Sequence, residues 1–395
     1  MDDVSVGERT ARARKLARLT QPQLAMQASV SLSLLRKVEQ GSRPASPVFI
    51  AAVARVLGVG IADLTGQPYA PEQHDGGAHA TIPELRRAIV AFDDETPAVP
   101  PTFDELTTTL DRVREGMRRA RYSDLTADLP DVIRGLHLLA ADQAPGCHRE
   151  AVHSALAYAY SKAMLFAYQY GYLDLAALAA ERCTWSADRS GDRVWTIAAE
   201  YNRALILLSS GAYTGGQRII QRAYSASEDL ETTPDLLAVR GALHLRGAIL
   251  SARALDADTA EAHLREASGI ASAVAGISYR NYGTGFRPSN VDIHSVAVPV
   301  ELSDYTAAVT RAERIRLPSS VAPSRVGHHH IDLSRAWLLH GDHQRALASL
   351  EKARAAAPEL TRNHPQVHET VRALARSRRG TGSLTRFAKW ANIRI

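Results

Sequence analysis

Apolar side chains recur at helical spacing along most of the 395-residue chain. Residues 7–66 divide into five short helices, each with its apolar side chains on one face. Thr20 and Ser31 stand where N-caps are expected, and Pro22 falls in a first turn, where its missing N–H costs nothing. The same periodicity continues to Ile395 with almost no strand signal. The pattern therefore predicts an all-α protein.

Long helices in the second part of the chain come in pairs joined by tight turns. The second helix of each pair is rich in alanine, and the turns begin at Gly171, Gly211, Asp256, Ser303 and Gly341. Their spacings of 40, 45, 47 and 38 residues exceed the ~34 residues of a tetratricopeptide repeat, which this region nevertheless resembles. Stacked pairs of this kind form an α-solenoid whose first helices line a concave groove. Irregular helical hairpins are the alternative.

A polar stretch separates these two regions. Residues 67–81 are rich in proline, glycine and polar side chains, which is typical of a flexible linker. We expect an N-terminal domain over residues 1–66 and a helical repeat domain over residues 82–395. Within the latter, Thr102 followed by Glu105 indicates a capping box at the start of a helix.

Composition and charge narrow the class of protein. Hydrophobic residues make up 45% and charged residues 23%, which is typical of a folded soluble protein, and no apolar run approaches the ~18 residues of a membrane span. The polar N-terminus does not resemble a signal peptide, and the two cysteines suit a reducing compartment. We therefore expect a cytoplasmic protein without membrane contact.

The net charge of +5 is concentrated near the N-terminus. Residues 1–66 hold nine Lys and Arg against five Asp and Glu, whereas the other 329 residues hold 38 against 37. Positive charge concentrated in one small domain favours a phosphate backbone as its partner.

The third short helix has the composition of a helix that reads DNA. Leu35 and Val38 lie three residues apart and share an inward face, with Val30 beneath them. The opposite face is free to lie in a major groove. It carries Leu32, Ser33, Arg36 and Lys37.

The order and spacing of residues through this whole domain support a family resemblance. The succession resembles the xenobiotic-response-element helix-turn-helix family, to which lambda-type phage repressors belong. It comprises Leu19-Thr20-Gln21, Leu24-Ala25, Val30-Ser31, Leu35, Val38-Glu39-Gln40-Gly41, Pro44, Leu57-Gly58-Val59 and Leu64. The resemblance implies a five-helix domain over residues 5–66 that regulates transcription. A bundle that docks a protein is the alternative.

The resemblance also implies a role for individual side chains. Gln21 and Arg43 would bind phosphates. Members often carry Gln or Arg at the position of Leu32, so an apolar residue there either contacts a thymine methyl or relaxes specificity. The base edges would be met by Leu32, Ser33, Arg36 and Lys37.

Polar residues recur in the same columns when the helix pairs are aligned on their turns. Such columns predict a solvated inner face that binds an effector, although they could also be the outer side of ordinary helices. Arginines in one column would suit an anionic ligand or a peptide carboxylate. The candidates are Lys162, Trp195, Asn202, Arg240, His244, Arg287, His294, Arg325 and His329.

Residues 276–290 interrupt the repeats with glycine, arginine and aromatic side chains, a composition typical of functional loops. This segment adds Tyr282 and Asn290 to the effector candidates. A repeat protein with such an N-terminal domain resembles the peptide-pheromone receptors of Gram-positive bacteria. That resemblance implies that groove asparagines, here Asn202 and Asn290, hold a peptide backbone.

Other motifs give no chemistry. His328, His329 and His330 are consecutive on a helix and cannot all ligate one ion without unwinding it, so we expect neither a metal nor a cofactor. Phosphate-binding glycine loops, zinc-protease motifs and serine elbows are missing from the sequence, which argues against an enzyme. The C-terminal cations either reach DNA or, as we favour, belong to a capping helix anchored by Phe387 and Trp390.

The sequence thus predicts a ligand-responsive transcription regulator. We expect a homodimer, because two half-sites supply the affinity for a double-stranded operator that one small helix lacks. A peptide or small-molecule effector in the groove would modulate operator binding, in the manner of quorum sensing. The alternative is a DNA-binding adaptor whose repeats dock a protein partner, with no small effector.

Overall fold

Helices form the whole framework of the protein. The computed structural model describes residues 4–69, 76–92, 101–122, 127–377 and 382–395, and every regular element in these ranges is a helix. The all-α class predicted from the sequence is therefore confirmed.

The first five helices enclose a core of their own. They are α1 (Val6–Leu16), α2 (Gln21–Gln27), α3 (Leu32–Glu39), α4 (Pro47–Leu57) and α5 (Ile61–Thr65). The side-chain oxygens of Thr20 and Ser31 accept backbone N–H bonds from Gln23 and Leu34, so both predicted N-caps are confirmed. Apolar side chains from these helices form a cluster centred on Leu24, Leu35, Val38, Phe49 and Val53.

Three helices connect this bundle to the repeats. They are α6 (Gly76–Ala91), α7 (Phe103–Arg119) and α8 (Leu129–Asp142). The capping box predicted at the start of α7 is present, since Thr102 and Glu105 exchange backbone and side-chain hydrogen bonds. Helix α6 begins inside the segment expected to be a linker, so residues 76–81 are helical. Residues 70–75 lie outside the described residues.

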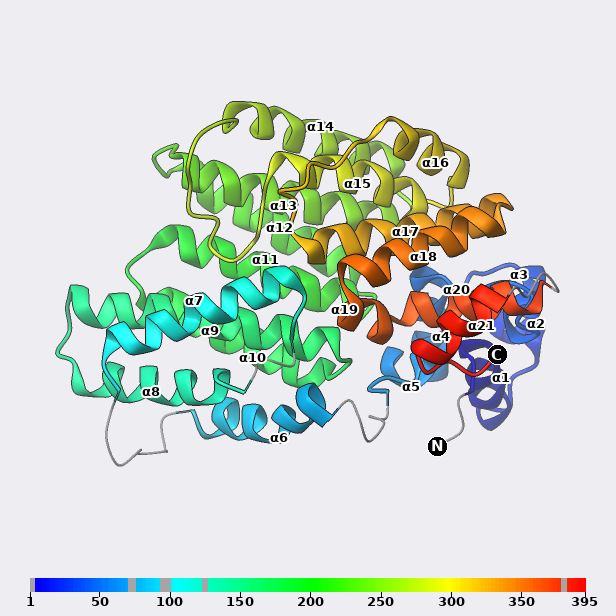
Figure 1. Cartoon of the computed structure of the whole chain (residues 1–395), viewed down its shortest axis with the longest axis horizontal. Helices are drawn as coiled ribbons and strands as arrows, with labels where there is room; N and C mark the ends of the chain where they lie inside the picture. The colour runs from blue at the N-terminus through cyan, green and yellow to red at the C-terminus, as the bar shows by residue number, and fades with distance from the viewer. Residues whose placement is uncertain (1–3, 70–75, 93–100, 123–126, 378–381) are drawn as a thin grey trace.

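Five helical hairpins follow, and they stack in chain order (Figure 1). The residue at each turn has a left-handed backbone, which lets the chain reverse within a few residues. These residues are Gly171, Gly211, Leu255, Ser303 and Gly341, and they confirm the predicted turns. The pairs are α9 (Cys147–Gln169) with α10 (Leu173–Arg189), α11 (Arg193–Ser209) with α12 (Tyr213–Glu228), α13 (Pro234–Arg253) with α14 (Ala257–Ala273), α15 (Pro288–Glu301) with α16 (Tyr305–Arg314), and α17 (Pro323–His340) with α18 (His343–Ala356).

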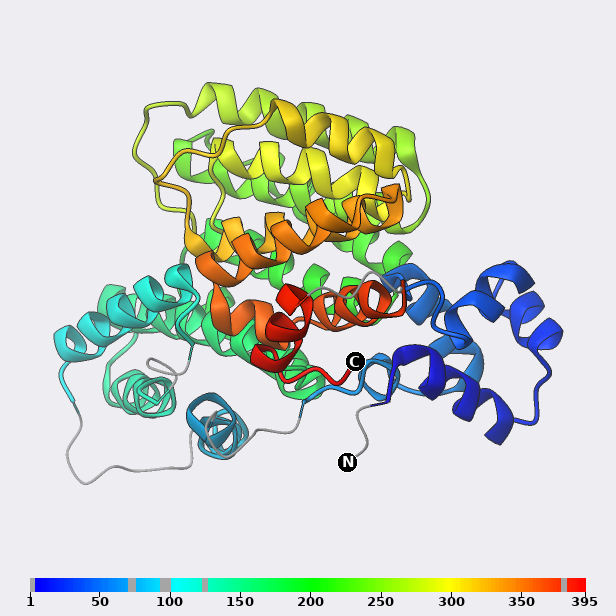
Figure 2. The ribbon, with the colours of Figure 1, turned by 45° about the vertical axis from the view of Figure 1, so that its right-hand side comes forward.

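Three shorter helices end the chain: α19 (Pro358–Asn363), α20 (Pro365–Arg376) and α21 (Gly382–Trp390). Phe387 is fully buried, and the guanidinium groups of Arg354 and Arg362 lie 4.5 and 5.0 Å from the Trp390 ring. These two aromatic residues therefore anchor α21 to the repeats, as expected of a capping helix. Figure 2 shows α20 and α21 between the hairpins and the first five helices.

Candidate functional site

Helix α3 presents a polar face to solvent because its apolar face packs into the N-terminal core. Leu35 and Val38 are buried, whereas Ser33, Arg36 and Lys37 are exposed. Within the described part of the chain, neither Arg36 nor Lys37 forms an ion pair. Two cations and a hydroxyl are thus available to an external partner.

The remaining candidates of this domain differ in their surroundings. Leu32 is half-buried and packs against the domain core, so packing accounts for its apolar side chain. The Gln21 amide donates a 2.7 Å hydrogen bond to a Glu39 carboxylate oxygen. Arg43 is partly exposed and follows α3 by a turn in which its backbone N–H bonds to the Lys37 carbonyl.

Glu39 connects three helices, a role that sequence reasoning missed. Arg14 on α1 donates to both of its carboxylate oxygens, at 2.7 and 2.9 Å, and Gln21 on α2 donates to one of them. Burial alone would raise the pKa of Glu39, but these hydrogen bonds hold it below its usual value. The available signal was an acidic residue in the middle of the Val38–Gly41 motif.

A cavity of about 1150 Å³ lies between α7, α9, the N-terminus of α17 and the loop at residues 276–290. Its cations outnumber its acids, and three acids already form ion pairs: Asp111 with Arg114, Glu115 with Arg118, and Asp192 with Arg280. The charged lining comprises Arg114, Arg118, Lys162, Arg280, Arg287 and Arg325 with Asp111, Glu115, Glu150 and Asp192.

The loop at residues 276–290 folds inward on this cavity. The Tyr282 ring is buried with its centre 5.2 Å from that of Trp195, and Phe286 is fully buried. Lys162 Nζ lies 3.2 Å from the Gly283 carbonyl oxygen, and burial lowers the pKa of Lys162 to about 8. The loop thus covers Trp195 and engages Lys162 through its own backbone.

Two further candidates hold the same loop. Arg325 Nη2 donates to the Thr284 carbonyl over 3.3 Å, and Asn290 Nδ2 donates to the Gly285 carbonyl over 2.9 Å. The structure therefore brings together six of the predicted effector residues around residues 279–290. They are Lys162, Trp195, Tyr282, Arg287, Asn290 and Arg325.

The other candidates are dispersed over neighbouring helix contacts. Asn202 donates to Cys183 Sγ, Arg240 to the Ser227 hydroxyl and carbonyl, and His244 pairs with His263 at 2.9 Å. His294 bonds to the Asn290 carbonyl, and His329 is buried beside His330. Arg287, in contrast, belongs to the loop and lies exposed over the Tyr279 ring.

A solvated inner face was expected for these columns, but most of their side chains are shielded from solvent. Seven of the eleven candidates are buried, although Trp195, His244 and His329 each keep a ring nitrogen without a hydrogen-bond partner among the described residues. The buried candidates are Lys162, Trp195, Asn202, His244, Tyr282, Asn290 and His329. Polarity in the sequence therefore did not mark exposure here.

Two residues beside Arg325 were missed by the alignment of columns. Tyr201 and Arg246 each stand ten residues before a turn, next to the column at nine residues that was chosen. The Arg246 guanidinium lies 4.4 Å from the Tyr201 ring centre. An arginine and a tyrosine at equivalent positions of successive repeats were the signal that could have found them.

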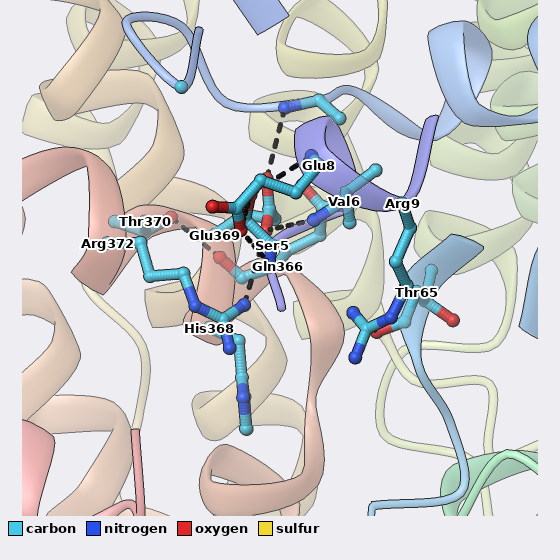
Figure 3. A network of polar contacts seen from close by, with 12 residues as sticks. Ser5, Val6, Glu8, Arg9, Thr65, Gln366, His368, Glu369, Thr370 and Arg372 are labelled. Atoms are coloured by element: carbon cyan, nitrogen blue, oxygen red, sulfur yellow. Dashed lines mark hydrogen bonds and ion pairs between the residues drawn. The ribbon is translucent and has the colours of Figure 1, made fainter. Parts of the chain in front are cut away.

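Helix α20 packs on the N-terminal domain through a buried carboxylate (Figure 3). One oxygen of Glu369 accepts from Val6 N at 3.4 Å, and the other accepts from Ala45 N at 3.5 Å. Arg376 donates a 2.7 Å hydrogen bond to the Gly41 carbonyl, just after α3. Helix α20 therefore contacts the N-terminal domain at the start of α1 and in the segment between α3 and α4.

The described ranges hold neither a cluster of metal ligands nor a helix that could span a membrane. His328 faces His364 at a ring distance of 5.8 Å, whereas His329 contacts His330, so the three consecutive histidines diverge. In those same ranges, no group of three or more His, Cys, Asp and Glu could hold an ion. A helix with the length and apolarity of a membrane span is likewise missing there.

The first domain matches a known protein family. A helix-turn-helix domain family matches residues 5–65, which confirms the family expected there. No curated protein matches the chain.

Solved structures of two helical proteins are similar to this chain. PlcR of Bacillus thuringiensis, in complex with the peptide PapR7 and DNA, is 15% identical over 68% of this chain and 95% of its own, with a TM-score of 0.28. The apo form of the competence regulator ComR from Streptococcus vestibularis is 14% identical over 75% of this chain and 98% of its own, with a TM-score of 0.25. At such scores, the functional conclusions must come from this chain's own residues.

Proposed function

Because residues 5–65 form a helix-turn-helix domain, we propose that the protein regulates transcription by binding an operator through α3, under the control of a signal held by the helical repeats. The observation that carries the proposal is the outer face of α3, where Ser33, Arg36 and Lys37 are exposed and the cations have no acidic partner in the described chain. Such a face matches the acceptors of a DNA major groove and its flanking phosphates.

Each candidate of the domain takes a defined part in this proposal. Arg36 and Lys37 contact base edges or phosphates, and Ser33 approaches the groove from the first turn of α3. Gln21 has one amide N–H left for a phosphate, because an amide carries two donors and Glu39 accepts from only one. Arg43 binds a phosphate beside the end of α3.

The repeats take the part of the sensor. Their cavity is large enough for a ligand of several residues, and its surplus of arginine and lysine suits a peptide or a small anion. The same repeats carry α20, whose Glu369 and Arg376 contact the helix-turn-helix domain. A change in the cavity therefore has a physical route to the DNA-binding face.

The DNA-binding part is tested by selection from random-sequence DNA. The intact chain is expected to enrich a defined sequence, and Arg36→Ala and Lys37→Ala should each weaken binding to it by about 1–3 kcal/mol. Arg55→Ala is the matched control, because Arg55 is an exposed arginine of the same domain on α4.

Two results would refute this assignment. The first is enrichment of no sequence by the intact chain. The second is an equal loss of binding in the α3 variants and in Arg55→Ala, since general charge rather than α3 would then bind the DNA.

A further inference from the structure

Two arginines that form no ion pair within the described residues interact with the same tyrosine. Arg246 belongs to α13 and Arg325 to α17, and both guanidinium groups stabilise the charged form of the Tyr201 side chain on α11. Arg246 lies over the Tyr201 ring at 4.4 Å from its centre. Three hairpins thus each contribute one polar side chain to this cluster, in which the two arginines interact with Tyr201.

Neither arginine has an acidic partner within the described residues. The buried Nε of Arg246 has no hydrogen-bond acceptor, and Arg325 donates to the Thr284 carbonyl at 3.3 Å. A buried donor left unpaired destabilises the folded state unless a ligand supplies an acceptor. The pair therefore retains both charge and donor capacity.

Another pair of buried arginines, in contrast, is neutralised by acidic side chains of the same chain. Arg253 and Arg335 share the carboxylate of Glu301 at 3.0 and 2.9 Å, and Arg335 also contacts Asp332 at 3.3 Å. Two acids balance two arginines there. No such carboxylate stands beside Arg246 and Arg325 in the described part of the repeats.

The positive charge of Arg246 and Arg325 shifts the pKa values of the neighbouring side chains. Burial would raise the pKa of Tyr201, yet the two guanidinium groups bring it below its ordinary value. Burial, reinforced by Arg325 and Arg246, lowers the pKa of both His294 and His328 to about 3. These imidazoles are therefore neutral at pH 7 and add no charge of their own.

Solvent reaches the site. Tyr201, Arg246, His294, Arg325 and His328 are each partly exposed. Arg325 also lines the 1150 Å³ cavity beneath the loop at residues 276–290. A molecule in that cavity can place a charged group on Arg325.

We propose that Arg246, Arg325 and Tyr201 form a binding site for an oxyanion, a carboxylate or a phosphate group. Guanidinium groups bind such planar or tetrahedral oxyanions with paired N–H donors, and the phenol hydroxyl supplies another donor. The inference rests on the proposed function, in which this oxyanion is the charged group of the signal. In this site Arg246 binds the anion together with Arg325, a role that the alignment of columns predicted for Arg240 and Arg287.

The test uses the intact chain and two probes, inorganic phosphate and acetate, at constant ionic strength. An anion that binds the folded state raises the melting temperature in a saturable manner, and the concentration dependence gives a dissociation constant. At least one probe is expected to bind, and Arg246→Gln and Arg325→Gln should each weaken it tenfold or more. The probe that binds identifies the chemical source of the oxyanion.

Arg222→Gln is the matched control, because Arg222 is exposed on α12, away from this site. Arg246→Lys, which keeps the charge but loses the paired donors, should weaken binding less than Arg246→Gln and guards against a folding defect. Equal stabilisation of the intact chain and all variants would overturn the proposal, as would the absence of saturation with both probes. These readouts need no DNA, so the site can stand even if the selection experiment fails.

Discussion

Glu39 shows how one side chain organises the DNA-binding domain. Its carboxylate joins α1, α2 and α3 through Arg14 and Gln21, and the ion pair is almost fully shielded from solvent. A shielded pair of this geometry is costly to break from one side, because the remaining charge loses its partner without regaining water. The orientation of α3 therefore depends on Glu39.

We predict that Glu39→Gln destabilises the N-terminal domain by about 3 kcal/mol at neutral pH, since Arg14 is left without its carboxylate. Hydrogen exchange of the α1–α3 amides measures the effect. Glu313→Gln is the control, because its ion pair with Arg345 is exposed and should contribute less than about 1 kcal/mol.

The effect of Glu39→Gln should also depend on pH. The pKa of Glu39 is lower in the folded protein than its ordinary value of 4.5, so the stabilisation is complete above 4.5 and is lost as the pH falls through the folded value. The difference between the two proteins should therefore shrink in acid. A difference that is constant from pH 7 to pH 3 would contradict the role of the carboxylate charge.

Single residues also mark where sequence reasoning stopped. The exposed positions of α3 followed from helical periodicity, because Leu35 and Val38 fix which face is buried. The groove residues did not follow, because a polar side chain such as Asn202 or His244 can be satisfied by a neighbouring helix. Which helix that is depends on packing angles that a single sequence does not specify.

At the scale of elements, the loop at residues 276–290 is the least regular part of the repeats and the most informative. Gly241 on α13 makes room for it: a Cβ at this position would lie 2.4 to 2.8 Å from the Phe286 ring. Phe286 is fully buried and is the loop's apolar anchor. A single methyl group can therefore displace the loop.

We predict that Gly241→Ala loosens the loop, because the Phe286 ring cannot keep its place. Trypsin should then cleave after Arg280 at least five times faster than in the unmodified chain. Gly269→Ala on α14 is the control, since a Cβ there meets nothing within 4 Å. Equal cleavage rates in the two variants and the unmodified chain would show that Phe286 does not anchor the loop.

Helix pairs and their turns were predictable because small or left-handed residues punctuate long apolar patterns. The start of α6 could not be predicted, because Gly76 and Gly77 lie inside a segment, residues 67–81, whose composition indicated a linker. Composition averages over a window, whereas a helix can begin inside it once its later residues pack. Ile82, Leu85 and Ile89 provide that packing.

At the scale of the whole molecule, the helical repeats and the helix-turn-helix domain are joined through a short series of contacts. Arg325 and His328 lie on α17, His328 faces His364 at the start of α20, and Glu369 and Arg376 on α20 contact the N-terminal domain. Spatial continuity alone does not prove coupling, which requires an equilibrium that both sites bias. In our account, that equilibrium is the docking of the N-terminal domain on α20.

Docking on α20 holds each DNA-binding domain in one orientation. Two domains of a dimer must adopt the spacing of adjacent half-sites, about 34–36 Å for one helical turn of DNA. We propose that undocking permits this adjustment and that the signal in the repeats shifts the balance between the docked and undocked forms.

The most direct test measures the affinity of the intact chain and of the double variant Glu369→Gln/Arg376→Ala for the DNA sequence obtained by selection. The variant lacks the carboxylate charge of Glu369 and the Arg376 hydrogen bond to Gly41, but keeps the whole outer face of α3. The account predicts binding at least five times tighter than that of the unmodified chain, with the same sequence preference. Equal or weaker binding by a folded variant would contradict control of the DNA-binding domain by the repeats.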